Sequence, residues 1–191
     1  MPKRKNCKKQ NTNPINSDSM EKLFIDMDNV LVDFASGLEQ VGADVKAQYE
    51  TWHDGTLVDT HYDDIPGIFA LMRPMPGAIE AVKTLATRYD LYILSTAPWN
   101  NPSAWSDKLE WVKRYFGNGE HDPFYKRLIL SHHKDLCLQP DSWLIDDRDK
   151  NGASAFQAEG RLLRFGKGDD AATCYPDWPS VTAFLMHRSA D

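Results

Sequence analysis

Residues 24–34 read Phe24-Ile25-Asp26-Met27-Asp28-Asn29-Val30-Leu31-Val32-Asp33-Phe34, an apolar run that leads into two carboxylates. If the residues before Asp26 form a buried strand, Asp26 emerges at its carboxyl end, where open α/β sheets place their ligand sites. One carboxylate can then act as a nucleophile, and Asp28 can carry a proton to or from a leaving group. The same pattern also arises by chance and often caps a helix, so this stretch alone leaves both interpretations open.

Length and charge limit the functions that the chain can have. Its 191 residues suffice for one domain with a small inserted lobe. The net charge is −6, but residues 1–20 carry five Lys or Arg and one Asp, a balance of +4, which leaves −10 for the rest. An acidic body does not suit a groove for a nucleic-acid polymer, because phosphate backbones are held mainly by Lys and Arg. A small anionic ligand is possible if a metal ion or local donors offset the repulsion.

The basic start of the chain and its cysteines favour a cytoplasmic location. Residues 1–20 lack the apolar core of a secretory signal, so we expect a disordered basic tail, although such a cluster can also serve as a localisation signal. Cys7, Cys137 and Cys174 form no Cys-x-x-Cys pair, which favours reduced thiols over a disulfide or a zinc site. No apolar run approaches the length of a membrane span.

Short apolar runs recur along the chain and predict an α/β fold. Between several of them lie segments with apolar residues at helical spacing, namely residues 76–88 and 104–116, and residues 178–187 suit a last helix. This alternation predicts a Rossmann-like parallel sheet flanked by helices. The predicted strands are residues 23–25, 91–94, 128–130, 143–145 and 162–165, and the predicted core face of the second helix is Trp105, Leu109, Val112 and Phe116.

Residues 35–75 interrupt this alternation. About forty residues separate the first strand from its crossover helix, far more than such connections usually contain. They look mostly helical and are rich in aromatic side chains toward their end. We therefore expect a helical cap at residues 35–75, inserted into a core of residues 21–34 and 76–191. Such a cap could close on a substrate at the carboxyl edge of the sheet.

Polar side chains follow four of the five predicted strands. In a parallel sheet these strand ends lie along one edge, so their side chains can serve one reaction. In a phosphate site Asp26 would be the nucleophile, Thr96 a hydrogen-bond donor and Lys134 a positive charge. The four groups are Asp26 with Asp28, Ser95-Thr96, Ser131-His132-His133-Lys134, and Asp146-Asp147.

Four carboxylates beside a phosphate dianion would repel it unless a cation is present. A hard divalent ion with oxygen ligands, most simply Mg²⁺, resolves the conflict. Adjacent carboxylates at Asp146 and Asp147, directly after an apolar strand, favour this, because buried charges are costly without a partner. The candidate metal residues are Asp26, Asp28, Asp146 and Asp147.

Each remaining element also has an ordinary explanation. Ser95-Thr96 can simply turn the chain, and Lys134 taken alone is a common surface residue. His132 and His133 are adjacent, and neighbouring positions seldom point the same way. We therefore expect them in a loop or beside the phosphate rather than on a metal.

In this order, the residues resemble the motifs of the haloacid dehalogenase (HAD) superfamily. Within this superfamily, residues 22–165 look like the 5′(3′)-deoxyribonucleotidases. Residues 73–83 and 111–117 are among the stretches that support this resemblance. The resemblance implies a phosphoric monoester hydrolase of the 5′-nucleotidase type that uses Mg²⁺ to dephosphorylate deoxyribonucleoside monophosphates. The matching residues are Asp26-Met27-Asp28, Thr96, Lys134 and Asp146-Asp147.

The resemblance also implies a role for each carboxylate. Asp26 would form a phospho-aspartyl intermediate, and Asp28 would protonate the leaving oxygen and then activate water. Magnesium would be held by the carboxylates of Asp26 and Asp147 and by the backbone carbonyl of Asp28, with Asp146 assisting through water. Which of Asp146 and Asp147 binds the ion directly stays open.

Substrate contacts follow from the same resemblance. Thr96 and Lys134 would grip the phosphoryl group, and Phe34 would pack on the base, although it also suits a core position. Asn29 stands where the family usually has Gly, and Asn tolerates a left-handed backbone better than most residues. The family analogy further suggests a homodimer, for which Trp99, Trp105 or Trp111 could supply an interface.

Two other functions fit the same residues. The chain could hydrolyse a non-nucleotide phosphate ester by the same chemistry. It could also be a non-catalytic module that binds a phosphorylated ligand, although a complete set of reactive side chains argues against that.

Overall fold

A parallel sheet forms the centre of the computed structural model, which describes residues 20–166 and 174–188. Among these residues, six strands pair in the order β10-β9-β8-β1-β6-β7. The five predicted strands are all present, while β10 is only two residues long and was not predicted. The predicted basic tail lies outside the described residues except for Met20. The strands are β1 (Lys22–Ile25), β6 (Asp90–Ser95), β7 (Leu128–Leu130), β8 (Ser142–Asp146), β9 (Leu162–Phe165) and β10 (Cys174–Tyr175).

The middle strand β1 sets the position of the polar strand ends. It pairs in parallel with β6 on one side and β8 on the other, and its Ile25 lies opposite Ile93 and Ile145. The backbone N–H of the next residue, Asp26, donates to Ile145 O at 2.9 Å. Asp26 and Asp146 therefore leave neighbouring strands at the same level of the sheet.

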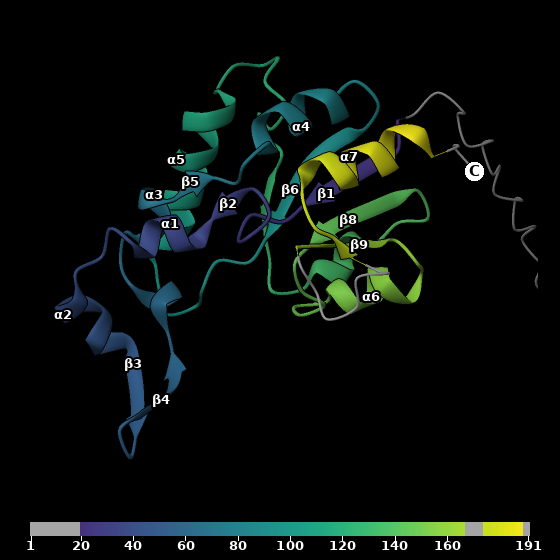
Figure 1. Cartoon of the computed structure of the whole chain (residues 1–191). Helices are drawn as coiled ribbons and strands as arrows, with labels where there is room; N and C mark the ends of the chain where they lie inside the picture. Colours follow the sequence, from purple (N-terminus) through teal and green to yellow (C-terminus); the bar gives the residue numbers. More distant parts are fainter. Residues whose placement is uncertain (1–19, 167–173, 189–191) are drawn as a thin grey trace, which may run out of the picture.

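Helices cover both faces of this sheet (Figure 1). Leu23 and Ile25 of β1 point into the larger core, which α4 (Ala78–Leu85) and α7 (Trp178–His187) close from one side. Phe24 points the other way and packs with Phe156 of α6 (Ala153–Ala158). Strand residues that alternate between two apolar layers explain why the strands read as continuous apolar runs. The predicted α/β fold class is confirmed.

Helix α5 (Ser103–Phe116) is present as predicted, but its buried face only partly matches the predicted one. Trp105 and Leu109, expected in the core, are 40% and 41% exposed, whereas Lys108 is completely buried. The prediction was right for Val112 and Phe116 but wrong for Trp105 and Leu109, because it assumed that apolar side chains alone define the buried face. Lys108 is buried because its ammonium has an acidic partner, the partly buried Asp28, at 2.8 Å. The buried residues of the helix are Ala104, Lys108, Trp111, Val112 and Phe116.

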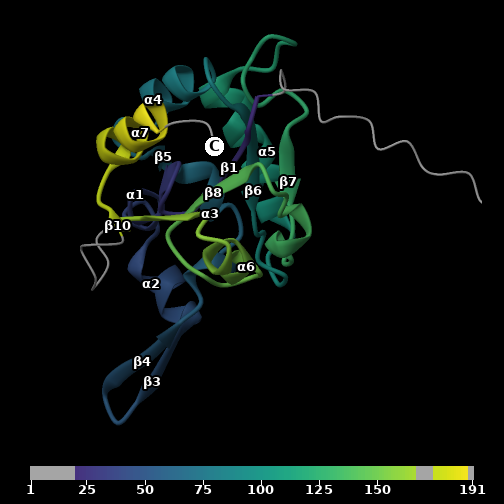
Figure 2. The same ribbon diagram turned by 90° about the vertical axis from the view of Figure 1, so that its right-hand side faces the viewer.

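The segment between β1 and α4 contains the expected short helices and also a β-hairpin that we did not predict. The hairpin projects from the rest of the chain (Figures 1 and 2), and every residue of its second strand is exposed. It therefore lacks a buried face and shows no clear apolar alternation. The elements are β2 (Val32–Asp33), α1 (Phe34–Leu38), α2 (Ala43–Lys46), η1 (Ala47–Tyr49), β3 (Glu50–His53), β4 (Thr56–Thr60), η2 (Tyr62–Asp64), α3 (Ile68–Leu71) and β5 (Arg73–Pro74).

A local signal for this hairpin does exist in the sequence. Its turn is Asp54-Gly55, and both residues have positive φ, 48° and 76°. Asp-Gly is a preferred pair for two-residue hairpin turns, because both positions need a left-handed backbone. The turn chemistry therefore predicts the hairpin where the apolar pattern does not.

Two contacts tie the C-terminal end of the inserted segment to the body. Strands β2 and β5 pair antiparallel, with Asp33 opposite Arg73. The indole N–H of Trp111 on α5 donates to Met72 O at 2.9 Å, next to helix α3. Within the part of the chain that the structure describes, no helix is long and apolar enough to cross a membrane.

Candidate active site

The first part of the site is the turn that follows β1. Asp26 is only 2% exposed, and the next residues fold back so that the N–H groups of Leu31 and Val32 both donate to Met27 O. Asn29 has φ 57°, the left-handed conformation expected for this position. This tight turn brings Asp28 back over the end of the sheet.

An acidic cluster lies where β1 and β8 end. One carboxylate oxygen from each of Asp26, Asp146 and Asp147 lies within 4.8 Å of the others. Asp147 Oδ2 accepts a hydrogen bond from Asn29 Nδ2 at 3.2 Å. Asp147 Oδ1 is buried without a hydrogen bond, although Arg148 Nε lies 3.4 Å away. Such an unsatisfied oxygen, in a set of oxygen donors only, fits a hard divalent cation.

Lys134 supplies positive charge inside this cluster. Its Nζ lies 3.0 Å from Asp26 Oδ1 and 2.5 Å from Asp146 Oδ2, in a nearly fully buried position. Burial, with the charge of Asp26 added, raises the pKa of the Asp146 carboxyl to about 7. Burial opposes the charge of Lys134, but Asp26 and Asp146 together outweigh it and raise the pKa of the ammonium. One lysine therefore does not fully satisfy the buried carboxylates.

Thr96 and Lys134 are connected through Asn151, which sequence reasoning missed. Asn151 Nδ2 donates to Thr96 Oγ1 at 3.2 Å, and Asn151 O accepts from Lys134 N at 2.7 Å. The hydroxyl of Thr96 donates to Ser131 O at 2.9 Å. The neighbouring Gly152 has φ 88° and leaves no room for a Cβ beside the backbone of Lys134. The Asn-Gly pair was the available sequence signal for this turn.

Lys108 is the second missed residue. Its Nζ donates to both carboxylate oxygens of Asp28, at 2.8 and 2.9 Å, and to Ser95 Oγ at 3.1 Å. It also lies 4.5 Å from the centre of the Phe69 ring. Burial raises the pKa of Asp28 despite the opposing charge of Lys108. A lysine at a core position of a predicted helix could have pointed to this pair.

Arg148 is the third residue that the sequence analysis did not assign. Burial opposes its charge, but Asp147 and then the other acidic residues of the site outweigh this and raise the pKa of the guanidinium. Arg148, Lys108 and Lys134 give three cations against five carboxylates, those of Asp26, Asp28, Asp63, Asp146 and Asp147. The side chains alone thus leave a net negative charge where we expect an anionic substrate, which again favours a bound cation.

Two adjoining cavities open at these strand ends. A small one of about 100 Å³ is lined by acidic, hydroxyl and basic side chains, and a larger one of about 380 Å³ lies beside it. Asp28, Asp63 and Arg148 border both. The small cavity is also lined by Asp26, Thr96, Pro98, Lys134 and Asn151, and the larger one by Asn29, Phe34, Thr60, His61 and Tyr62.

The sequence-predicted residues separate into three groups in space. Asp26, Thr96, Lys134, Asp146 and Asp147 come together around the small cavity and its acidic floor. The Asp28 carboxylate also borders that cavity, but it pairs with Lys108 and is not part of the three-carboxylate cluster.

Phe34 and the two histidines lie farther out. Phe34 lines the larger cavity and packs edge-on against Phe69, with ring centres 6.1 Å apart, so it has both a pocket and a core contact. His132 and His133 lie in the loop before η3 (Lys134–Cys137), and neither lines the two cavities. The expected loop position of the histidines is confirmed.

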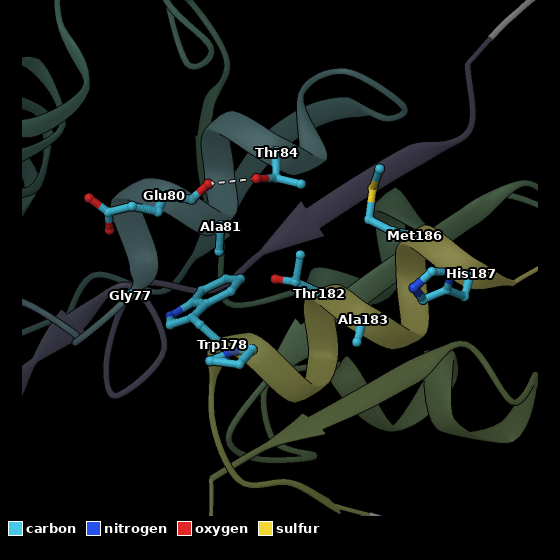
Figure 3. Close-up of a pocket in the computed structure, with 10 residues that line it drawn as sticks. Gly77, Glu80, Ala81, Thr84, Trp178, Thr182, Ala183, Met186 and His187 are labelled. Atoms are coloured by element: carbon cyan, nitrogen blue, oxygen red, sulfur yellow. Dashed lines mark hydrogen bonds between the residues drawn. The ribbon is translucent and has the colours of Figure 1, made fainter.

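Another groove lies away from the strand ends, between α4 and α7 (Figure 3). It has a volume of about 440 Å³ and a mainly apolar wall that includes Ala81, Trp178 and Met186. None of the residues that line it borders the two cavities above. The groove contains no cluster of charged side chains, so we place the candidate site at the strand ends.

The chain is similar to known proteins over most of its length. A family model described as "5′ nucleotidase, deoxy (Pyrimidine), cytosolic type C protein" matches residues 19–173. A protein of Vibrio phage KVP40, named as a candidate 5′(3′)-deoxyribonucleotidase, is 50% identical over 167 residues. That match covers 87% of this chain and 85% of the relative.

Solved structures show the same fold. A haloacid dehalogenase-like hydrolase from Xanthomonas campestris matches with a TM-score of 0.58 and 13% identity, covering 88% of this chain and 95% of that chain. The HAD hydrolase YfnB from Bacillus subtilis, solved with bound magnesium, matches with a TM-score of 0.54 and 14% identity. That match covers 88% of this chain and 99% of the other.

Proposed function

The chain belongs to the family of 5′ nucleotidases, deoxy (pyrimidine), cytosolic type C, and we propose that it is a Mg²⁺-dependent 5′(3′)-deoxyribonucleotidase. It is a phosphoric monoester hydrolase of the 5′-nucleotidase type with a HAD fold. The observation that supports the finer proposal most strongly is that Asp26 and Lys134 meet at one small cavity while Asp147 lies in the same acidic cluster as Asp26.

In the first step Asp26 attacks the phosphorus atom. A bond forms between a carboxylate oxygen of Asp26 and phosphorus, and the bond from phosphorus to the ester oxygen breaks. Asp28 gives its proton to the departing oxygen, which leaves as the deoxynucleoside hydroxyl. The raised pKa of Asp28 suits it to carry this proton.

In the second step water releases the phosphate. Asp28, now a carboxylate, takes a proton from a water molecule, and the water oxygen attacks phosphorus. The bond to Asp26 breaks, so that Asp26 is regenerated and inorganic phosphate is free. Lys108 lies where it holds the Asp28 carboxylate in one orientation through both steps.

The acidic cluster is suited to hold the cation. The carboxylates of Asp26 and Asp147 and the backbone carbonyl of Asp28 would bind Mg²⁺, with Asp146 assisting through water. The unsatisfied Asp147 Oδ1 supports this assignment. The ion would offset the negative charge of the carboxylates and of the phosphoryl group.

Each of the two cavities would hold a different part of the substrate. Thr96 and Lys134 border the small cavity, which suits the transferring phosphoryl group, and Arg148 adds positive charge there. Phe34 borders the larger cavity, which suits the nucleoside. Residues 35–75 would then act as a cap on a core of residues 21–34 and 76–191, since His61, Tyr62 and Asp63 of this segment form part of the larger cavity's wall.

The expected surroundings of the enzyme are also part of this proposal. Its partner would be a small phosphate ester and neither a nucleic-acid polymer nor a membrane, and its location the cytoplasm. A homodimer is proposed from the family analogy. Trp99, which is 80% exposed, and Trp105 are then better candidates for the interface than the buried Trp111.

The test is a substrate panel measured with and without magnesium. The panel contains 5′- and 3′-deoxyribonucleoside monophosphates, the matching ribonucleotides, and sugar and cofactor phosphate esters. We expect the highest kcat/KM for a deoxyribonucleotide and loss of turnover when a chelator removes the metal. A sugar or cofactor ester as the best substrate would favour the non-nucleotide alternative. Tight binding of deoxyribonucleotides without phosphate release would indicate a binding module.

A further inference from the structure

A buried amide joins the inserted segment to the loop that follows Thr96. Asn101 lies in that loop, between β6 and α5, and is 1% exposed. Its Nδ2 donates to Asp63 O at 2.8 Å and to Ile65 O at 3.0 Å. The contact spans 38 and 36 positions in sequence, so it connects two separate parts of the chain.

The oxygen of the same amide is also satisfied. Asn101 Oδ1 accepts from Ser103 Oγ at 2.9 Å, and Ser103 Oγ in turn accepts from the backbone N–H of Gly67 at 2.8 Å. The network therefore holds three points of residues 63–67 against one loop. A buried polar group with all its hydrogen bonds made has one strongly preferred arrangement.

Both sides of this contact border the proposed substrate site. Residues 60–63 form one wall of the larger cavity, and Asp63, whose carbonyl Asn101 binds, borders both cavities. On the other side, Pro98 of the Asn101 loop lines the small cavity, next to Thr96. Asn101 thus fixes the distance between the nucleoside wall and the phosphate wall.

His61 and Tyr62, which belong to the same wall of the larger cavity, are held by other contacts on the side of the β3–β4 hairpin. The Tyr62 hydroxyl donates to Glu50 Oε1 at 2.5 Å, and His61 N donates to Tyr49 O at 2.8 Å. These bonds lie inside the inserted segment, so they shape the wall without tying it to the core. Asn101 provides a tie to the core close to the cavities.

We propose that Asn101 is a positioning residue that sets the affinity for the nucleoside part of the substrate. It touches neither the phosphoryl group nor the reacting carboxylates. It holds residues 63–67 in place, with Asp63 at the border of the small cavity, so that the larger cavity keeps the shape that a nucleoside needs. The inference rests on the proposed nucleotidase function and deepens it.

The test compares two substrates in the magnesium-loaded full chain. Thymidine 5′-monophosphate needs both cavities, whereas acetyl phosphate needs little more than the small one. Asn101→Asp keeps the size of the side chain but replaces two N–H donors with an oxygen that faces two carbonyls. We expect its KM for the nucleotide to rise about tenfold or more, because two buried acceptors lose their donors. The kcat for the nucleotide and the kcat/KM for acetyl phosphate should stay within about threefold of the unmodified chain.

A control with the same donor pattern but at an exposed position comes from Gln40. Its Nε2 also donates to two backbone carbonyls, Ser36 O at 2.9 Å and Leu71 O at 2.7 Å, but it borders neither cavity. Gln40→Glu makes the same chemical change within the inserted segment, and we expect an unchanged KM. Ser103→Ala removes the link to Gly67 and should raise the nucleotide KM in the same direction, which keeps the test valid if Asn101→Asp does not fold.

The outcomes separate the two proposals. An unmodified chain that hydrolyses neither substrate overturns the nucleotidase proposal itself. If the unmodified chain is active, two results overturn the role of Asn101. One is a folded Asn101→Asp variant with an unchanged nucleotide KM, and the other is a variant that loses activity equally on both substrates. A selective rise in the nucleotide KM supports it.

Discussion

Lys108 donates hydrogen bonds to both carboxylate oxygens of Asp28, at 2.8 and 2.9 Å, across 80 positions of sequence. The lysine is fully buried, and the third hydrogen bond of its ammonium goes to Ser95 Oγ. A buried lysine is costly unless it is paired and hydrogen-bonded. The pair therefore fixes the position of Asp28 and of helix α5 at the same time.

Replacing Lys108 should destabilise the protein and impair catalysis. Lys108→Met leaves the partly buried Asp28 carboxyl without its cation, for which we expect a loss of about 3 kcal/mol in the free energy of unfolding. Urea denaturation measures this loss, and kcat measures the effect on proton transfer. Lys113→Met is the control on the same helix, because Lys113 pairs with Glu110 at the surface and should cost about 1 kcal/mol or less. Equal stability of the two variants would contradict the importance of the pair.

Gly152 should be needed to place Lys134. A Cβ at Gly152 would lie 2.2 Å from Asp135 Oδ1 and 2.9 Å from Lys134 N, and the residue has φ 88°. Gly152→Ala should therefore lower kcat/KM by shifting Lys134. Gly160 also has a positive φ, but a Cβ there meets nothing within 4 Å, so Gly160→Ala should cost about 1 kcal/mol of backbone strain and leave activity intact. Equal kcat/KM values for the two variants would contradict the role of Gly152.

Magnesium should stabilise the protein more at high pH than at low pH. The ordinary pKa of Asp146 is 3.8, and in the folded, metal-free protein it is about 7. Below about pH 4 both the folded and the unfolded states carry this proton, and between about 4 and 7 only the folded state keeps it. As the pH rises through this window, the group makes folding less favourable, and a cation that replaces the proton removes the penalty.

Thermal denaturation with and without magnesium tests this pH dependence. We expect a larger rise in Tm at pH 8 than at pH 5.5, with sodium chloride of equal ionic strength as the control. The same rise at both pH values would show that no proton competes with the ion.

Removing the proposed nucleophile should separate activity from folding. Asp26→Asn should lower kcat by about a thousandfold or more, since no carboxylate oxygen remains to attack phosphorus. It should not unfold the protein, because Lys134 keeps Asp146 as a partner and one source of carboxylate repulsion is gone. Circular dichroism and Tm provide the control for folding. Retained turnover in purified variant would exclude Asp26 as the nucleophile.

The strands and the first carboxylates could be predicted because local sequence determines them. Strands such as 143–145 are buried on both faces and therefore read as apolar runs. Asp26, Thr96, Lys134 and Asp146 each follow such a run, and parallel strands bring their ends together. The order of strands and polar residues along the chain was therefore enough to predict that these residues share one site.

The roles of Lys108 and Asn101 were not predicted, because they depend on partners far away in sequence. Lys108 occupies a core position only because Asp28 is opposite, and apolar periodicity alone placed Trp105 and Leu109 in the core by mistake. Asn101 looks like an ordinary loop residue until the inserted segment lies beside it. The β3–β4 hairpin was not predicted for the opposite reason. It has no buried face, so only its Asp54-Gly55 turn indicates it in the sequence.

The most direct test of the account is chemical trapping of the intermediate on Asp26. The Asp28→Asn variant, which should form the phospho-aspartate but release phosphate slowly, is mixed with thymidine 5′-monophosphate and magnesium, quenched and reduced with borohydride. Reduction converts a phosphorylated aspartate to homoserine, which peptide mass spectrometry can locate. We predict homoserine at position 26 only when substrate and magnesium are both present. Release of thymidine with no reduced aspartate, or with homoserine at another position, would contradict the account.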